Sequence, residues 1–321
     1  MERKKCLAIM LALLLALMIS GCGGGSSTPQ QANEPEADPE YPALVGGAII
    51  EFRPSRVVSL APSLTEKIYD LGHERRLVGI SDHHGDYPAS IAHLPSYGIA
   101  TLPDIDGILA LGAHVVFSVS ELPVDAMNAL ERAEIPLIIL PSYAHSMAEL
   151  EEIYMGISMA LSGRTTGQII GEQFIQIFND RIDEIAARHA GSGRRNAAYL
   201  RSLDFMMATG DTLEGELMER IGFINIAAGQ TGWVFEPEEA NSEAGQELFQ
   251  SVEVIFFDEN YVTTEALEQS AFWSGIDIPM YIYVNNKIFE RQTLRMLDQL
   301  EIMAVARSTG ILPLLPDSET S

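Results

Sequence analysis

Residues 146–190 read SMAELEEIYMGISMALSGRTTGQIIGEQFIQIFNDRIDEIAARHA, and this stretch decides the fold. Apolar side chains recur in it every three or four residues, which is the spacing of one face of an α-helix. No strand pattern interrupts the stretch, so we expect one helix that ends near Leu161 and a longer helix over residues 165–188. Residues 146–190 are therefore predicted to be a helical connector.

Short β-branched runs alternate with amphipathic stretches on both sides of this connector, a pattern typical of parallel sheets covered by helices. Before the connector we expect strands at residues 56–61, 77–80, 114–119 and 137–140, and helices at 63–71, 104–111 and 125–133. After it we expect strands at 197–200, 254–257 and 280–284, and helices at 213–221, 264–269 and 292–307. The sequence thus predicts two α/β lobes, over residues 49–145 and 191–309, with a tail at 310–321.

The N-terminus has the features of a secretion signal. Residues 1–5 are basic, and the apolar run from Leu7 to Ile19 is short for a membrane span. Two small residues then precede Cys22, as in the bacterial lipobox, in which the cysteine is lipidated. We expect residues 1–21 to be removed and the acylated Cys22 to anchor the protein at the extracytoplasmic face of the cell membrane, on the cell surface or in the periplasm. A plain signal peptide or a marginal membrane anchor is the alternative.

Residues 22–48 are expected to be a flexible linker. Glycine and serine follow Cys22, and a stretch rich in Pro, Gln and Glu comes next. A chain of this length and composition has a typical reach of about 25–30 Å. That reach allows a folded domain to meet a partner in the membrane.

Charge and cysteine content exclude several classes of function. The formal net charge of −25 repels nucleic acid and anionic lipid. The second cysteine, Cys6, lies in the expected signal peptide, so disulfides, thiolate metal sites and a cysteine nucleophile are not expected. The chain has no serine-hydrolase elbow, Walker loop, zinc-protease motif or dinucleotide fingerprint, so we do not expect an enzyme. A lipid-anchored hydrolase and a structural or adhesive surface lipoprotein remain as alternatives.

Several segments resemble the ferric-siderophore and cobalamin binding proteins of ABC importers. In the first lobe they are residues 56–66 with Leu60-Ala61-Pro62-Ser63, Asp86-Tyr87-Pro88, and residues 102–116. In the second lobe they are residues 214–227, the Phe272-Trp273 pair, and residues 288–304 with Phe289-Glu290-Arg291. The resemblance implies two Rossmann-like lobes joined by a long helix, as in class III periplasmic binding proteins. It also implies a monomer that carries a ferric siderophore, cobalamin or haem in the cleft between its lobes to an importer permease.

Ligands of open α/β sheets bind beyond the carboxyl ends of the strands, often at helix N-termini. The candidate ligand-binding residues at these ends are Pro62, Ser63, His83, Tyr87, Tyr97, Glu121, Arg201, Phe205, Trp233 and Tyr261. Trp233 lies in a glycine-flanked polar loop and could stack on a ligand or simply pack. Arg201 is a candidate counter-ion for an anionic chelate, with a surface arginine as the alternative. Arg201 and the tyrosines favour an iron chelate slightly.

Residues 82–86, Asp-His-His-Gly-Asp, could instead ligate a bare transition metal, but no second cluster completes a closed site. We therefore expect no resident metal or cofactor. The family resemblance implies one acidic residue on each lobe that engages arginines of the permease. Asp106 occupies that place in the first lobe, and Glu243 is the choice in the second, with Glu247 close behind.

Overall fold

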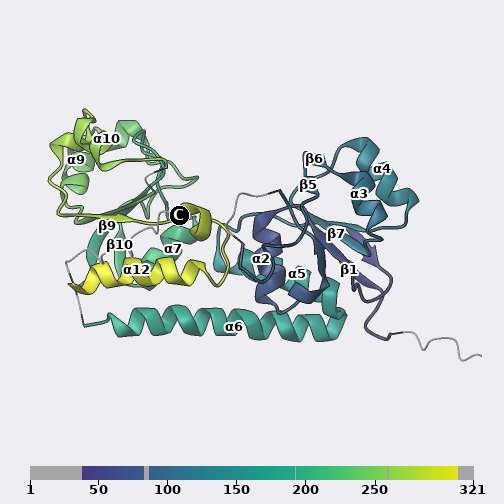
Figure 1. Cartoon of the computed structure of the whole chain (residues 1–321). Helices are drawn as coiled ribbons and strands as arrows, with labels where there is room; N and C mark the ends of the chain where they lie inside the picture. The colour runs from purple at the N-terminus through teal and green to yellow at the C-terminus, as the bar shows by residue number, and fades with distance from the viewer. Residues whose placement is uncertain (1–37, 83–86, 192, 259, 310–321) are drawn as a thin grey trace, which may run out of the picture. The chain divides into compact units, whose positions relative to one another are not determined.

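The computed structural model describes residues 38–82, 87–191, 193–258 and 260–309, and Figure 1 shows their arrangement. Two four-stranded sheets, each parallel throughout, form the centres of the two lobes. The predicted mixed α/β class is confirmed by these sheets and their helices. Within the described residues, no helix is both long and apolar enough to cross a bilayer.

The first sheet has the strand order β4-β3-β7-β8. Its strands are β3 (Val57–Ser59), β4 (Leu77–Gly79), β7 (Val115–Ser118) and β8 (Leu137–Ile139). The helices of this lobe are α2 (Pro62–Asp70), α3 (Ile105–Ala110) and α4 (Val124–Arg132), with a 3-10 turn, η2, at Glu74–Arg76. All residues of β3 and β7 are buried, which explains why these strands are continuous apolar runs.

The second sheet has the strand order β10-β9-β11-β12. Its strands are β9 (Arg195–Leu200), β10 (Phe223–Asn225), β11 (Val254–Phe257) and β12 (Met280–Tyr283). Its helices and its 3-10 turn are α7 (Leu213–Arg220), α8 (Pro237–Ala240), α9 (Glu243–Gln250), α10 (Thr264–Gln269), η3 (Trp273–Gly275), α11 (Asn286–Phe289) and α12 (Met296–Thr309).

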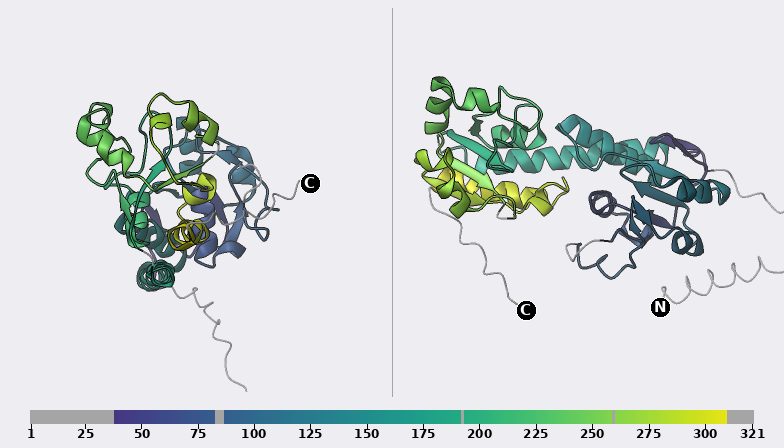
Figure 2. Two further views of the ribbon diagram at one scale, coloured as in Figure 1. Left: turned by 90° about the vertical axis from the view of Figure 1, so that its left-hand side faces the viewer. Right: turned by 90° about the horizontal axis from the view of Figure 1, so that it is seen from above.

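Two helices connect the sheets, α5 (Met147–Ser162) and α6 (Arg164–Arg188), and their bounds lie close to those predicted. Gly163 separates them and has a φ of 96°. Residues that carry a Cβ rarely adopt this backbone conformation. At Gly167 a Cβ would lie 2.4 Å from the Cα of Met159, so the absence of a side chain lets the two helices approach closely. Figures 1 and 2 show α12 of the second lobe alongside α6, which it contacts.

One hydrophobic core runs through both sheets and the connector. Phe117 of β7, Tyr154 of α5, Phe178 of α6 and Phe256 of β11 all belong to it. The rings of Tyr154 and Phe174 stack at 4.4 Å within the connector. The amphipathic pattern of residues 146–190 therefore buries apolar faces that serve both lobes.

Two boundaries of predicted segments differ clearly from those in the structure. The linker was expected to extend to residue 48, but residues 43–50 form a hairpin of β1 (Ala43–Val45) and β2 (Ala48–Ile50). Ala43, Val45 and Ile50 are buried in the core, so this segment belongs to the folded body. The last helix begins at Met296 instead of residue 292, because the residues before it make contacts of their own with the first lobe.

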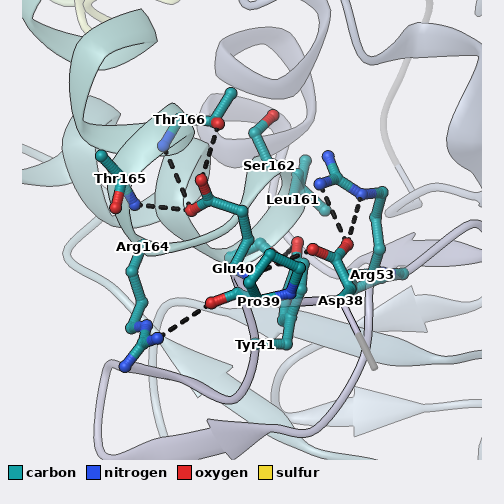
Figure 3. A network of polar contacts seen from close by, with 12 residues as sticks. Asp38, Pro39, Glu40, Tyr41, Arg53, Leu161, Ser162, Arg164, Thr165 and Thr166 are labelled. Atoms are coloured by element: carbon teal, nitrogen blue, oxygen red, sulfur yellow. Dashed lines mark hydrogen bonds and ion pairs between the residues drawn. The ribbon is translucent and has the colours of Figure 1, made fainter. Parts of the chain in front are cut away.

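The chain just before the hairpin is fastened to the start of α6, as Figure 3 shows. The carboxylate of Glu40 accepts hydrogen bonds from the backbone N–H groups of Thr165 (2.7 Å) and Thr166 (3.3 Å) and from the Thr166 hydroxyl. Asp38 pairs with Arg53 at 3.1 Å. Glu40 thus caps the long helix, so the folded body, and not the predicted linker, includes Glu40 and the residues after it.

Candidate functional site

Polar and aromatic side chains gather around Arg201, the residue that follows β9. We call this set the Arg201 cluster; it comprises Tyr143, Tyr199, Arg201, Glu214, Trp233, Asn286 and Glu290. The guanidinium carbon of Arg201 lies 3.6 Å from the centroid of the Trp233 ring and 5.7 Å from that of Tyr143. Its Nη2 is 2.8 Å from a carboxylate oxygen of Glu290. Arg201 is therefore stacked and paired within the protein.

Glu214 is the buried acid of this cluster, with 1% of its side chain exposed. One of its oxygens accepts a hydrogen bond from the Tyr143 hydroxyl, and the other lies 3.9 Å from Nη2 of Arg201. Burial raises the pKa of Glu214 to about 7. Burial, followed by the nearby Glu214, raises the pKa of Tyr143. Tyr143 belongs to the loop after β8 and Glu214 to α7, so both lobes build the cluster.

Three buried polar atoms of the cluster have no hydrogen-bond partner among the described residues: Nε of Arg201, one carboxylate oxygen of Glu214 and Nδ2 of Asn286. The remaining polar groups of Asn286 are engaged, since its Oδ1 accepts from the Tyr199 hydroxyl and its backbone N–H donates to Asp258. Buried polar groups are normally paired. Two donors and one acceptor are thus available to a bound group.

A second polar network joins the lobes at Glu66 of α2. This buried carboxylate binds the guanidinium groups of Arg291 and Arg295 and accepts a hydrogen bond from the Thr293 hydroxyl at 3.2 Å. Lys67, also fully buried, donates to the backbone carbonyl of Arg291. Burial lowers the pKa of Lys67 to about 7 and that of Arg291 to about 10. The guanidinium of Arg291 also lies 5.6 Å from the Tyr87 ring.

The segment of residues 290–295, which we call the strap, links the Arg201 cluster to this junction. Its first residue, Glu290, pairs with Arg201, and its second, Arg291, pairs with Glu66. Gln292 makes two hydrogen bonds with the backbone of Ala144, accepting from its N–H at 2.6 Å and donating to its carbonyl at 2.8 Å. Ala144 adjoins Tyr143, so the strap holds the loop that contributes Tyr143 to the cluster.

Comparison with known proteins shows to which protein family the chain belongs. Residues 57–277 match the family model described as "Periplasmic binding protein". The chain belongs to the periplasmic binding protein family. Proteins of this family are substrate-binding components of transporters and not enzymes. The chain is therefore a substrate-binding protein of an ABC transporter, as the sequence predicted.

Individual relatives agree with this assignment. The uncharacterized ABC transporter substrate-binding lipoprotein YvrC of Bacillus subtilis is 24% identical, and the match covers 94% of this chain and 96% of that protein. The vitamin B12 binding protein BtuF of Vibrio cholerae has a TM-score of 0.54 at 19% identity, covering 79% of this chain and 96% of BtuF. A periplasmic haem-binding protein of Pseudomonas aeruginosa has a TM-score of 0.58 at 22% identity, covering 82% and 95%. These two structures show that the fold is shared.

The first-lobe residues predicted for this periplasmic binding protein lie in different settings. Pro62 and Ser63 begin α2, as expected for a strand-to-helix turn, and Glu121 is exposed three residues after β7. Tyr87 is mostly buried and shares a hydrogen bond with the hydroxyl of Ser81. The ring of Tyr97 packs closely against Gly79 and Gly107, where any Cβ would clash with it. Tyr97 is therefore partly buried against the core of the first lobe, and its contact with ligand stays a prediction.

In the second lobe, the structure brings Arg201 and Trp233 together in the Arg201 cluster. Trp233 has 8% of its surface exposed, because Arg201 covers one ring face and Tyr199 and Tyr143 flank it. Tyr261, four residues after β11, is 58% exposed. Phe205 packs into an aromatic core group with Phe249, Phe272 and Trp273 and is 9% exposed. Its contact with ligand stays a prediction.

Sequence reasoning missed Tyr143, Tyr199, Glu214, Asn286 and Glu290. Glu214 and Glu290 lie in segments that carried the family resemblance. The acidic residue in each segment was the sequence feature that could have indicated a site residue there. Tyr143 had no such signal. Its position depends on the turn after β8 and on the hydrogen bonds between Ala144 and Gln292.

Two other predicted sites differ in how far the structure describes them. The proposed docking residues Asp106 and Glu243 are both exposed, each in the first turn of a helix, and Glu247 is exposed one turn further along α9. His83, along with most of the possible metal-binding stretch, lies outside the described residues, as does Cys22. Among the described residues, no group of three His, Cys, Asp or Glu side chains is arranged to hold a metal ion.

Proposed function

We propose that this protein is a lipid-anchored receptor that binds a metal chelate outside the cytoplasm and delivers it to the permease of an ABC importer. The observation that carries the proposal is the Arg201 cluster. It lies beyond the carboxyl ends of the strands, where open α/β sheets bind ligands. It combines aromatic surface with buried polar atoms that lack partners. Such a mixture is typical of sites for small organic ligands.

The names of similar proteins support a metal chelate as cargo. BtuF is described as a vitamin B12 binding protein, and the protein from Pseudomonas aeruginosa as a haem-binding protein. A protein from Staphylococcus epidermidis, described as possibly iron-binding, has a TM-score of 0.63 at 16% identity, covering 79% of this chain and 98% of its own. We extend this substrate class to the present chain as part of the proposal.

Binding of ligand can be tested by titrating the purified protein with cobalamin, haem and a panel of ferric siderophores while following tryptophan fluorescence. Trp233 stacks on Arg201, so occupation of the Arg201 cluster should change its emission. We expect saturable binding of one compound in the micromolar range or tighter. The absence of binding across the panel would refute the chelate receptor.

Delivery to the importer is proposed to depend on Asp106 and Glu243, whose exposed carboxylates are available to permease arginines. Reversing both charges, with Asp106→Arg and Glu243→Arg, should abolish ligand uptake while ligand affinity stays unchanged. The exposed acids Glu131 of α4 and Glu265, in the first turn of α10, give a control in which the same number of charges is reversed at other exposed positions. Normal uptake by the Asp106/Glu243 variant would rule out this docking site.

Anchoring is proposed to occur through a lipidated Cys22. Cys22→Ser removes the thiol that would carry the first acyl chain, so the protein should move from the membrane fraction to the soluble fraction. Ser20→Ala keeps a small residue in the lipobox and should leave the protein on the membrane. Retention of the Cys22→Ser protein on membranes would contradict a lipid anchor at this position.

A further inference from the structure

The charges around Arg201 bear on the kind of ligand that the cluster can accept. Arg201 is the one basic side chain among the seven residues of the cluster, and it already pairs with Glu290 at 2.8 Å. The ring of His145 lies outside this set, 5.3 Å from that of Tyr143. Two further carboxyl groups lie close by, Glu214 at 3.9 Å from Arg201 and Asp258 beside Asn286. The pKa of the exposed Tyr261 is raised, first by the negative charge of Glu290.

The negative charges near Arg201 make the binding of an anionic ligand unfavourable. Its carboxylate or catecholate would have to displace Glu290 from Arg201, or bring another negative charge beside Glu290 and Asp258. The stacking of Arg201 on Trp233 at 3.6 Å further restricts the guanidinium from turning toward a new partner. Arg201 is thus a poor counter-ion for the anionic chelate expected from the sequence.

The unpartnered atoms specify what the ligand should offer. Nε of Arg201 and Nδ2 of Asn286 are donors. The free oxygen of Glu214 accepts a hydrogen bond when the carboxyl group is ionised and can donate one when it is protonated, and a pKa of about 7 populates both forms near neutral pH. A carboxylate can accept from the two donors but offers no hydrogen to the ionised form of Glu214. An ammonium group can donate to Glu214 but cannot accept. A carboxamide or a peptide amide does both.

Apolar surface lies next to these atoms. Met206 and Val234 are bridge partners on neighbouring segments, and they are 39% and 38% exposed. The backbone of Met206 is bonded to Arg201, and Val234 follows Trp233. An uncharged ligand body could contact this surface together with the exposed Tyr261.

We infer that the ligand of the Arg201 cluster is neutral or cationic and meets the cluster through amide groups, rather than being an anionic chelate. This inference rests on the proposed receptor function and narrows its substrate class. It assigns Glu290 a role in specificity, as the internal counter-charge of Arg201. It also assigns Glu214 and Asn286 as the polar contacts of the ligand amide.

The test is a calorimetric titration of the full-length protein in detergent against ligands of different charge. Cyanocobalamin and ferrichrome are neutral and carry amides, ferrioxamine B is cationic and carries amides, and haem and ferric enterobactin are anionic. We expect the tightest binder to be one of the first three, by at least about tenfold over either anionic compound. An anionic compound as the tightest ligand overturns the inference and leaves the receptor role standing. No binding by any compound refutes the receptor role, and the inference falls with it.

A variant separates the role of Glu290 from general effects on the site. Glu290→Gln keeps the size of the side chain and removes its charge, so Arg201 becomes available to an anion. The affinity for anionic ligands should then rise by about tenfold relative to that for the amide-bearing ligands. Glu131→Gln, at an exposed position on α4, should leave this ratio unchanged. An unchanged ratio in Glu290→Gln would also overturn the inference.

Discussion

Glu214 is a carboxyl group that folding removes almost completely from water, and its environment makes the stability of the protein sensitive to pH. Its ordinary pKa is 4.5, and burial raises the pKa to about 7 in the folded chain. Between these values the unfolded chain releases the proton while the folded chain retains it. Unfolding is therefore favoured as the pH rises through this window.

Replacement of Glu214 by Gln should remove this dependence. The amide oxygen can still accept from the Tyr143 hydroxyl, but no proton has to be lost at high pH. We expect the free energy of unfolding of Glu214→Gln to exceed that of the natural protein by about 1–3 kcal/mol at pH 8 and to be similar at pH 4.5. Urea denaturation at the two pH values measures both numbers. An equal difference at both would show that ionisation of Glu214 is not its cause.

Gln292 combines an unfavourable backbone conformation with two buried hydrogen bonds. Its φ is 53°, and its amide pairs with both polar groups of the Ala144 backbone. Gln292→Ala leaves that backbone N–H and carbonyl buried without partners, so we expect a loss of about 2–4 kcal/mol in unfolding free energy. Gln292→Gly loses the same bonds but relaxes φ, and it should lose about 1 kcal/mol less. Thermal denaturation compares the two, and a Gly variant more stable than the natural protein would contradict this account.

Elements with a long, clear period were predicted well, and elements held by tertiary contact were not. Helix α6 begins and ends within one residue of its predicted bounds, because its apolar positions recur along its whole length. Strand β10 has only three residues, and its middle residue, Ile224, is exposed, so the pattern was too short to recognise. The Arg201 cluster was predicted only at Arg201 and Trp233, since its other members meet through loops and helix ends whose conformation local sequence does not define.

The N-terminus of α6 offers a test at the scale of one element. Glu40 is distant in sequence, yet its carboxylate binds the first N–H groups of the helix, which lowers the pKa of Glu40. A depressed pKa stabilises the folded chain above pH 4.5, and this contribution is lost as the pH falls through the folded value. Glu40→Gln should therefore lower the melting temperature at pH 7 by a few degrees and much less at pH 3.5.

A matched control for Glu40 is available on the same part of the chain. Glu51 is exposed, and Glu51→Gln removes the same charge without touching α6. Calorimetric melting of the two variants at pH 7 separates capping from the general effect of net charge. Equal melting temperatures would show that the Glu40 carboxylate does not cap the helix in solution.

The two lobes share more than a linking helix. The hydrophobic core that contains Phe117 of the first sheet also contains Phe256 of the second, through Tyr154 and Phe178 of the connector. The strap adds polar contacts from the second lobe to α2 and to the loop after β8. Because apolar burial and paired charges both cross between the lobes, we expect neither lobe to unfold while the other remains intact.

The ion pair between Glu66 and Arg291 allows a direct test of whether the two lobes unfold together. Both side chains are almost fully buried, at 1% and 5% exposed. Glu66→Gln removes the buried carboxylate that Arg291 and Arg295 share and should cost about 3–5 kcal/mol of unfolding free energy. Arg291→Met leaves Glu66 with Arg295 and Thr293 and should cost less. The double variant leaves neither charge of this pair behind, and it should cost less than the sum of the single variants by about 1–3 kcal/mol. Denaturant unfolding, followed by fluorescence and circular dichroism, should give one transition in all four proteins. Additive losses would show that the pair does not couple the lobes, whereas two transitions in the double variant would show that this pair, and not the shared core, makes them unfold together.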